Sequence, residues 1–167
     1  GRLHKFVESG IPVVGLEPSC MFTIRDDYLS LVPGPESEAL ASHVQLLDEF
    51  LFQEHQKGQL KLPLRKISQE KIWVHGHCHQ KAANATGSTL GILQTIPGLE
   101  VELIPSSCCG MAGSFGYESE NYEISMKMAE LSLLPKIRTL DQNHGIVACG
   151  TSSVSYTHLT VPTIYSV

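Results

Sequence analysis

The chain has 167 residues, of which 42% are hydrophobic and 17% charged, and its mean hydropathy is +0.00. This composition is typical of a folded α/β domain and excludes a disordered or collagen-like chain. The formal net charge of −5 leaves no basic surface for nucleic acid or an anionic membrane. No apolar run approaches the roughly 20 residues that span a bilayer, and residues 1–10 lack a signal-peptide core, so we expect a cytoplasmic protein without direct membrane insertion.

The first third of the chain predicts one strand and one long helix. Residues 11–16 are mostly aliphatic and predict a buried strand, which ends in a proline turn before a loop that carries Cys20. Apolar residues then recur at helical spacing, at Leu40, Val44, Leu47 and Leu51. This spacing predicts a helix over residues 36–56, with Ser37 as the N-cap and Gly58 as the stop.

The middle of the chain predicts a strand, a helix and another strand. Residues 71–75 predict the strand, residues 76–81 a turn, and residues 82–96 the helix. Residues 99–104 alternate apolar and charged side chains and predict the next strand. A loop over residues 106–113 follows it.

The last part of the chain predicts a helix and a fourth strand. Residues 120–134 predict an amphipathic helix that ends near Pro135. Its apolar stripe consists of Ile124, Met128, Leu131 and Leu134. Residues 145–148 predict the strand. The alternation of strands and helices predicts an α/β fold, with a parallel sheet, flanking helices and right-handed, Rossmann-like βαβ crossovers.

Each predicted strand is followed within a few residues by cysteine. These cysteines are Cys20, Cys78, the pair Cys108 and Cys109, and Cys149. Because ligand sites of open parallel sheets lie beyond the carboxyl ends of the strands, we expect the thiols along one edge of the sheet. Thiolates are soft ligands that favour zinc, copper(I) or iron–sulfur clusters. For Cys20 or Cys149 alone, an inert buried thiol explains the sequence equally well.

Two local patterns surround these cysteines. The vicinal pair is followed by Gly110, whose freedom at positive φ would let the turn approach a bulky cofactor. Three histidines alternate around Cys78, at His75, His77 and His79. In an extended segment these imidazoles would share one face, which allows zinc ligation. We favour instead a role in orienting the loop or hydrogen-bonding to the sulfurs of a cluster.

An internal repeat relates the first strand to the last. Residues 13–20 match residues 146–153 as a strand followed by a serine-containing turn. The match places Ser153 where Cys20 lies in the first copy, so the second copy lacks a thiol at this position.

Three strings of the sequence resemble the cysteine-rich CCG domain of iron–sulfur oxidoreductases. They are GLEPSC at residues 15–20 with Arg25-Asp26 after it, HGHCHQK at residues 75–81, and SSCCGMAGSFG at residues 106–116. The resemblance covers nearly the whole chain up to Ser152. It is greatest to the C-terminal part of flavin-linked D-lactate dehydrogenase-type enzymes and to the glycolate oxidase iron–sulfur subunit. In that family two such domains follow a ferredoxin-like segment and carry electrons between a flavin and an acceptor.

The resemblance implies a 4Fe-4S type cluster held by Cys78, Cys108 and Cys109, with a fourth ligand in the final turn. It makes Cys20 the last ligand of a preceding domain, whose end is residues 1–35, and makes residues 36–153 a second domain. Cys149 is the less favoured ligand. The chain would then be a fragment that is not catalytic by itself. FAD would bind elsewhere in the parent enzyme. The partners of this chain would be the flavin-binding domain or subunit and the ferredoxin-like segment of that enzyme. Through the parent enzyme the chain would lie peripheral to the inner membrane.

The chain departs from the family at its end, where Ser153 stands in place of a cysteine. Residues 154–167 carry no charged side chain, and we interpret them as a non-native tail. A serine oxygen is a hard, weakly acidic donor, so its presence would impair retention of a cluster.

Two other functions remain open on the sequence alone. The first is a zinc-binding structural or interaction module that uses the three cysteines and one histidine. The second is a thiol–disulfide enzyme at the vicinal pair. No G-x-G-x-x-G string follows a predicted strand, so the sequence does not predict an NAD-binding Rossmann enzyme.

Overall fold

The computed structural model describes residues 2–141, 143–154 and 164–166. The chain divides into two compact units, Gly1–Lys61 and Leu62–Val167, which we call unit 1 and unit 2. Residues 36–61 fall in the same compact unit as the residues before them, and the predicted domain boundary after residue 35 stays a prediction. The assignment of either unit to a CCG domain stays a prediction.

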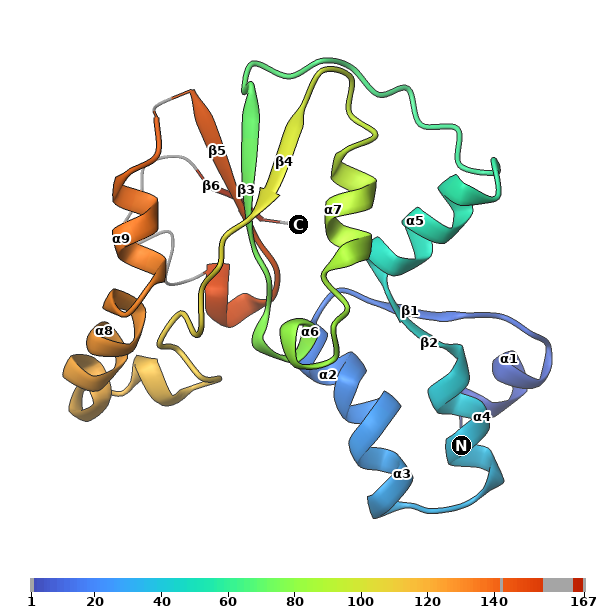
Figure 1. The fold of residues 1–167 in the computed structure, drawn as a ribbon. Helices are drawn as coiled ribbons and strands as arrows, with labels where there is room; N and C mark the ends of the chain where they lie inside the picture. The colour runs from blue at the N-terminus through green and yellow to red at the C-terminus, as the bar shows by residue number, and fades with distance from the viewer. Residues whose placement is uncertain (1, 142, 155–163, 167) are drawn as a thin grey trace. The chain divides into compact units, whose positions relative to one another are not determined.

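Unit 1 consists of short helices and a small parallel sheet (Figure 1). Its elements are α1 (His4–Glu8), β1 (Val13–Gly15), α2 (Pro18–Phe22), the π-helix η1 (Thr23–Asp27), α3 (Tyr28–Leu31), α4 (Pro35–His43), β2 (Val44–Leu46) and α5 (Leu47–Gln56). Strand β1 pairs with β2, from Val13 beside Val44 to Gly15 beside Leu46. This pairing corrects the expectation of a single sheet, because β1 lies outside the sheet of unit 2.

The prediction of one helix over residues 36–56 is wrong. Strand β2 interrupts it, because Val44 and Leu46 are each only 2% exposed and pair with β1. Sheet pairing and burial of these side chains outweigh their helical spacing. Ser37 is not the N-cap, because Gly34 precedes α4 and the hydroxyl of Ser37 donates to the carbonyl of Val32. The predicted stop is confirmed: Gly58, at φ +70°, follows α5 and donates to the carbonyl of His55.

Cys20 lies in a helix, not in the predicted loop. Pro18 takes the first position of α2, where its missing N–H costs nothing, and the carboxylate of Glu17 caps the helix by accepting from Ser19. The strand before it is not buried either, since the side chain of Val14 is 38% exposed. The predicted order of a strand followed by a cysteine is confirmed here, because Cys20 follows β1.

In unit 2, the described strands form a parallel sheet in the order β4-β3-β5-β6, which we call the larger sheet. The elements of unit 2 are β3 (Lys71–His75), α6 (Cys78–Ala82), α7 (Gly87–Leu93), β4 (Glu100–Leu103), the 3-10 helices η2 (Phe115–Tyr117) and η3 (Ser119–Asn121), α8 (Tyr122–Glu130), α9 (Leu133–Arg138), β5 (His144–Ala148) and β6 (Ile164–Ser166). The predicted α/β class with a parallel sheet and flanking helices is confirmed. Strand β6 belongs to the segment interpreted as a non-native tail, and that interpretation stays a prediction.

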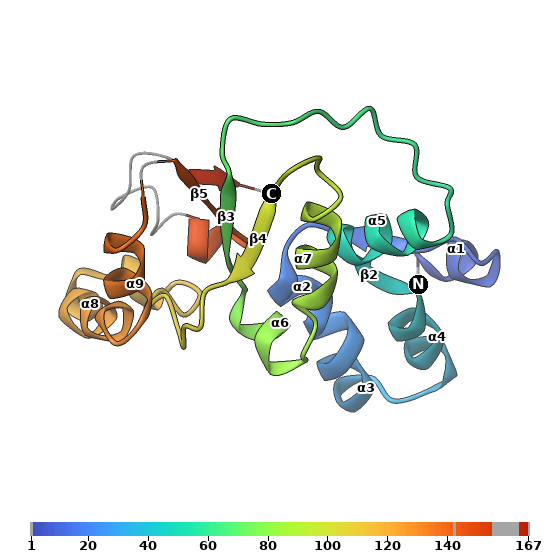
Figure 2. The ribbon, with the colours of Figure 1, turned by 45° about the horizontal axis from the view of Figure 1, so that its top comes forward.

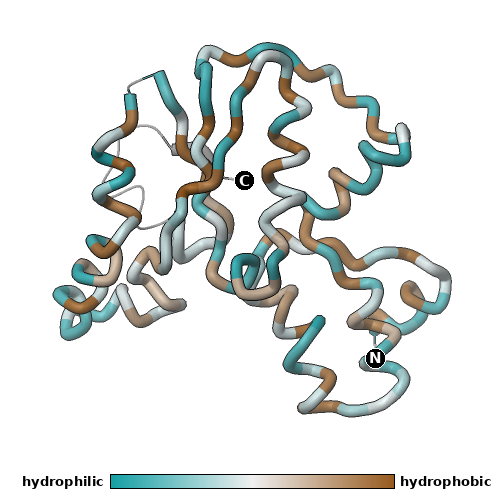
Figure 3. The backbone as a smooth tube through the Cα atoms, in the orientation of Figure 1, coloured by the Kyte–Doolittle hydropathy of each residue, from teal (hydrophilic) through white to brown (hydrophobic). Residues whose placement is uncertain are grey.

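Different helices cover the two faces of the larger sheet, as Figures 1 and 2 show. Trp73 of β3 packs in a cluster with residues of α8 and α9, including Ala129 and Leu133. Its neighbours Ile72 and Val74 point to the other face and pack near α7. The alternation of charged and apolar residues along β4 is visible in Figure 3.

Both predicted helices of unit 2 are divided. The helix predicted over residues 82–96 becomes α6 and α7, with Asn84 at φ +54° between them. The helix predicted over residues 120–134 ends at Glu130, and α9 begins at Leu133 with Pro135 in its first turn.

Within α8 the predicted apolar stripe is not the buried face, although Leu134 of the same predicted stripe, which lies in α9, is buried. Ile124 is 52% exposed and Leu131, which follows the helix, 76% exposed, whereas Ser125 and Ala129 are buried. Small side chains face inward here because a loop of unit 2 approaches α8 closely, as described below. None of the helices in the described part of the chain is long and apolar enough to cross a membrane.

Candidate functional site

Strands β3, β4 and β5 of the larger sheet end side by side, and cysteines follow each of these strand ends in the sequence. Val74 pairs with Leu103 of β4 and with Val147 of β5, and His75 pairs with Ala148. The residues that follow these strands are Cys78 after β3, Cys108 and Cys109 after β4, and Cys149 after β5. The predicted order of strand and cysteine is therefore confirmed in unit 2, while Cys20 belongs to unit 1.

Cys78 and Cys108 come together although they are 30 positions apart. Their Sγ atoms lie 3.9 Å from each other. Cys78 is exposed, and Cys108 is partly buried. Two thiols from separate strand ends therefore meet at the carboxyl end of the larger sheet.

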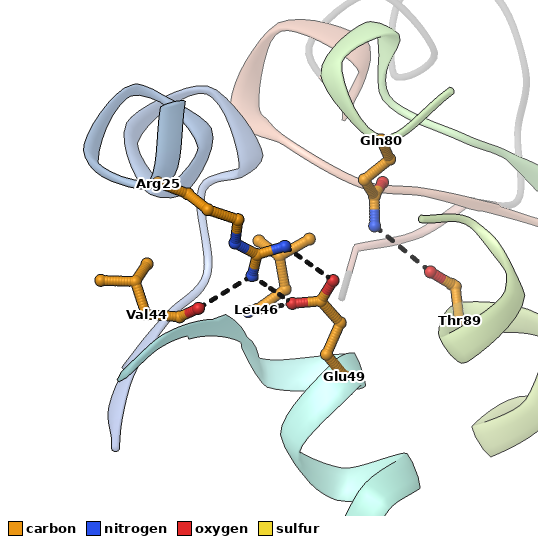
Figure 4. A network of polar contacts seen from close by, with 6 residues as sticks. All are labelled: Arg25, Val44, Leu46, Glu49, Gln80 and Thr89. Atoms are coloured by element: carbon orange, nitrogen blue, oxygen red, sulfur yellow. Dashed lines mark hydrogen bonds and ion pairs between the residues drawn. The ribbon is translucent and has the colours of Figure 1, made fainter. Parts of the chain in front are cut away.

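The start of α6 fixes the position of Cys78, the first residue of the helix. The imidazole Nδ1 of His77 accepts a hydrogen bond from the N–H of His79, and the side chain of Gln80 accepts one from the N–H of His77. Gln80 is 1% exposed and donates to Thr89 of α7 (Figure 4). Packing and capping together hold this helix start in one orientation.

The loop before Cys108 is tied to β3 and α6. The ammonium of Lys81 donates to the carbonyl oxygen of Ser106, at 2.9 Å, and to that of Ser107. Nδ1 of His75 shares a hydrogen bond with the hydroxyl of Ser106 at 2.8 Å. These contacts bring the loop beside Cys78 and also place a positive charge at the thiols.

Gly110 allows the loop to turn at the vicinal pair. Its φ is +92°, and a Cβ at this position would lie 2.1 Å from the carbonyl oxygen of Ser125 in α8. The glycine N–H donates to Sγ of Cys108 at 3.3 Å. The predicted need for a glycine here is explained by close approach to α8, which is also why Ser125 faces inward.

Cys109 points into the core of unit 2. It is 2% exposed and packs in the same cluster as Trp73 and Met111. The hydroxyl of Ser153 donates to Sγ of Cys109 at 3.8 Å, and Ser153 is 1% exposed. Residues 151–154 are helical, like α2 after β1, so the internal repeat is structural as well as sequential.

Burial disfavours the charged forms of the groups at this site. It raises the pKa of the Cys78 thiol to about 11, with a further rise from Cys108 and an opposing effect of Lys81. Burial likewise raises the pKa of Cys109, although hydrogen bonds from the Met111 backbone and from Ser153 oppose it. Without a cation, both thiols are protonated at pH 7, and a metal that binds them must displace their protons.

The histidines do not form the predicted extended face. Strand β3 ends at His75, and the rings of His77 and His79 stack at the start of α6 with centroids 5.2 Å apart. Burial, followed by the charges of Lys81 and His77, lowers the pKa of His75 to about 3, so its imidazole is neutral. Among the described residues, Nε2 of His75 has no hydrogen-bond partner, although it is buried.

The thiols of this site are donors of the kind that soft metals prefer, and nearby Nε2 of the buried His75 lacks a partner among the described residues. Across the described ranges, no three His, Cys, Asp or Glu side chains surround the position of a single ion. Sequence reasoning missed Lys81 and Ser106, whose hydrogen bonds tie the cysteine loop to its neighbours, and Ser125, whose backbone carbonyl lies against Gly110. Lys81 lies within the HGHCHQK string, which was the one signal that pointed to it.

Comparisons with known proteins find several dehydrogenases. The chain is 34% identical over 116 residues to a subunit of the anaerobic glycerol-3-phosphate dehydrogenase of Escherichia coli K12, a match that covers 70% of this chain and 28% of that protein. It is 30% identical to D-2-hydroxyglutarate dehydrogenase of Pantoea ananatis over 141 residues, which are 83% of this chain and 13% of that protein. The corresponding E. coli K12 enzyme is 30% identical over 143 residues.

The chain thus spans between 13% and 28% of the length of these curated relatives. No family model matches it. No solved structure matches it either.

Proposed function

We propose that this chain is the iron–sulfur electron-transfer part of a flavin-linked dehydrogenase that oxidises a 2-hydroxy acid. Cys78, Cys108 and Cys109 would hold the cluster, which when bound accepts and releases single electrons. The observation that carries the proposal is the 3.9 Å separation of the Cys78 and Cys108 sulfurs, beside Cys109, at the end of a parallel sheet.

The substrate class is supported by the relatives and not by the site. One group of relatives is named for D-2-hydroxyglutarate, which is a 2-hydroxy acid. Hydride transfer from such a substrate needs a flavin or a similar cofactor. We place FAD and a ferredoxin-like segment in partner domains or subunits, and this chain would take electrons from the flavin.

The residues around the thiols would prepare the site for a cluster. Lys81 supplies a positive charge that offsets the negative charge of bound thiolates. The N–H of Gly110 and the hydroxyl of Ser153 donate to Cys108 and Cys109, and hydrogen bonds to sulfur raise the potential of a cluster. His75 would direct its unpartnered nitrogen to the same group, while His77 and His79 hold the helix start.

Anaerobic reconstitution of the full chain with ferrous iron and sulfide tests this proposal. We expect visible absorption, an EPR signal in one redox state, and iron and sulfide in similar amounts per chain. Cys109→Ser should abolish iron retention. Cys20→Ser is the matched control and should leave it intact, because Cys20 belongs to unit 1.

Two results would overturn the proposal. One is equal loss of iron from the Cys109→Ser and Cys20→Ser variants. The other is a colourless protein that binds one equivalent of zinc, which would favour the structural zinc module instead. Metal analysis of the purified chain separates these outcomes without any assay of activity.

A further inference from the structure

The two sulfurs that meet at the sheet end can react with each other as well as with a metal. Sγ of Cys78 and Sγ of Cys108 are 3.9 Å apart, within thiol hydrogen-bond distance. Cys78 is the first residue of the short helix α6, and Cys108 lies in a loop, so each side chain can change rotamer without moving a strand. Cys78 is exposed and accessible to a dissolved oxidant.

We propose that Cys78 and Cys108 form a reversible disulfide when the site holds no metal, with a low-molecular-weight disulfide such as oxidised glutathione as the oxidant. A disulfide bond is about 2.05 Å long, so the sulfurs must approach each other by roughly 2 Å. This inference stands on the geometry of the two thiols and does not require the proposed function.

The reaction proceeds by two thiol–disulfide exchanges. The thiol of Cys78 first gives up its proton, and its thiolate attacks one sulfur of oxidised glutathione, which breaks the glutathione disulfide, forms a mixed disulfide and releases one glutathione. The sulfur of Cys108 then attacks the Cys78 sulfur and releases the second glutathione. The two protein thiols lose two electrons, glutathione disulfide gains them, and both thiol protons end on the released glutathione.

The geometry favours this pair over the vicinal pair. Adjacent Cα atoms lie about 3.8 Å apart across a trans peptide, which is shorter than the roughly 4.4 to 6.8 Å usual for disulfides. The described part of the chain contains no cis peptide bond. Cys109 is also 2% exposed, and its sulfur accepts from Ser153, so it points away from an oxidant.

A disulfide between Cys78 and Cys108 has a consequence for the metal centre. It consumes two of the three thiols that the proposed function assigns to the cluster, so the oxidised chain could not take up iron. This consequence rests on the proposed function. The site would then have two exclusive states, one loaded with metal and one closed by a disulfide that thiols reopen.

Mass spectrometry of the metal-free, full-length chain tests the inference. The reduced chain is treated anaerobically with oxidised glutathione and digested without reductant. We expect Cys78 and Cys108 to lose their thiols, to retain no glutathione, and to appear in one cross-linked peptide pair, whereas the exposed Cys20 can carry a glutathione adduct. Cys108→Ser should leave a stable glutathione adduct on Cys78, while Cys20→Ser should form the cross-link like the unaltered chain.

Stable adducts on Cys78 in the unaltered chain, or a cross-link between Cys108 and Cys109, would overturn the inference. A second measurement offers iron and sulfide to the oxidised chain before and after addition of dithiothreitol. A chain that forms the cross-link but takes up no iron after reduction supports the disulfide and contradicts the proposed function. A chain that takes up iron but forms no cross-link supports the proposed function and contradicts the disulfide.

Discussion

Gly110 combines a positive φ of +92° with a contact that no side chain could share, because a Cβ would lie 2.1 Å from the Ser125 carbonyl. We expect Gly110→Ala to destabilise unit 2 by about 3 kcal/mol or more, since backbone strain and steric overlap both act. Urea unfolding followed by the fluorescence of Trp73, the one tryptophan in the sequence, measures this.

Gly113 is the matched control for this substitution. Its φ is +68°, but nothing lies within 4 Å of its hypothetical Cβ among the described residues. Gly113→Ala should therefore cost only the conformational penalty of about 1–2 kcal/mol. Equal losses from the two alanine variants would show that contact with α8 is not what requires glycine at position 110.

Ser153 occupies the position from which a fourth thiol could reach the site, because its hydroxyl lies 3.8 Å from Sγ of Cys109. We expect Ser153→Cys to slow the loss of iron from the reconstituted chain to a chelator by several-fold. A thiolate is a softer and more acidic ligand than a serine hydroxyl. Chelator absorbance over time gives the release rate.

The neighbouring residue provides the control for the cysteine substitution. The hydroxyl of Ser152 donates to the carbonyl of Gly113 and not to a cysteine sulfur of the described residues. Ser152→Cys should therefore leave the release rate unchanged. If Ser152→Cys slows release as much as Ser153→Cys, the added thiol does not act by ligation at the Cys109 side of the site.

At the scale of elements, one ion pair joins η1 to the junction of β2 and α5 (Figure 4). Arg25 donates to Glu49 at 2.6 and 3.1 Å and also to the carbonyl of Val44. Glu49 in turn accepts from the N–H of Leu46. Burial raises the pKa of Glu49, but the hydrogen bonds from Arg25 and Leu46 outweigh it, and the pKa lies below its usual value.

A lowered pKa makes the stability of unit 1 depend on pH. The ionised carboxylate stabilises the folded unit above the unfolded pKa of about 4.3, and this stabilisation is lost as the pH falls through the lower folded value. We expect hydrogen exchange over residues 44–56, corrected for its intrinsic rate, to accelerate as the pH falls from about 6 to 3.

Glu49→Gln should remove most of this pH dependence and destabilise unit 1 by about 1–2 kcal/mol, because the pair is partly buried. The control is Glu54→Gln, which breaks the pair with the exposed Lys57. That change should have little effect on exchange, since exposed pairs contribute little. A pH dependence that survives in Glu49→Gln would assign it to another carboxylate.

The sequence predicts a segment correctly where the segment's own pattern matches its packing, and fails where a distant segment decides the structure. The strands predicted over residues 71–75 and 99–104 are present as β3 and β4, because their alternation or β-branched content matches burial in one sheet. The helix over residues 36–56 was wrong because Val44 fits a strand as well as a helix. The pairing of Val44 with Val13 decides between strand and helix. Val13 lies 31 residues earlier, so a local sequence pattern does not reveal this pairing.

The candidate site was predicted only as far as local pattern and resemblance reach. Cysteine after each strand end predicted the meeting of Cys78 with Cys108, because parallel strands share a carboxyl edge. The role of Lys81 could not be predicted, since it depends on where the carbonyls of a loop 25 residues away lie. The inward face of Ser125 was missed for the same reason, because the distant residue Gly110 packs closely against it.

At the scale of the whole molecule, the two units offer separate reporters. Trp73 lies in unit 2, in the same core cluster as Cys109, and its ring is flanked by the ammonium groups of Lys71 and Lys136. Unit 1 contains no tryptophan, so tryptophan fluorescence follows unit 2 alone. Hydrogen exchange over residues 44–56 follows unit 1.

A cluster that binds only the folded thiol site should stabilise unit 2 and leave unit 1 unchanged. Binding to the native state alone contributes about 2.7 kcal/mol when free ligand is at 100 times its dissociation constant. We therefore expect anaerobic reconstitution to quench Trp73 and to raise the urea midpoint of its transition, and a strong iron chelator to reverse both effects. Exchange over residues 44–56 should not change. A parallel slowing of that exchange would mean that the two units unfold together, whereas an unchanged Trp73 midpoint in an iron-loaded chain would place the metal outside the core that Cys109 shares with the tryptophan.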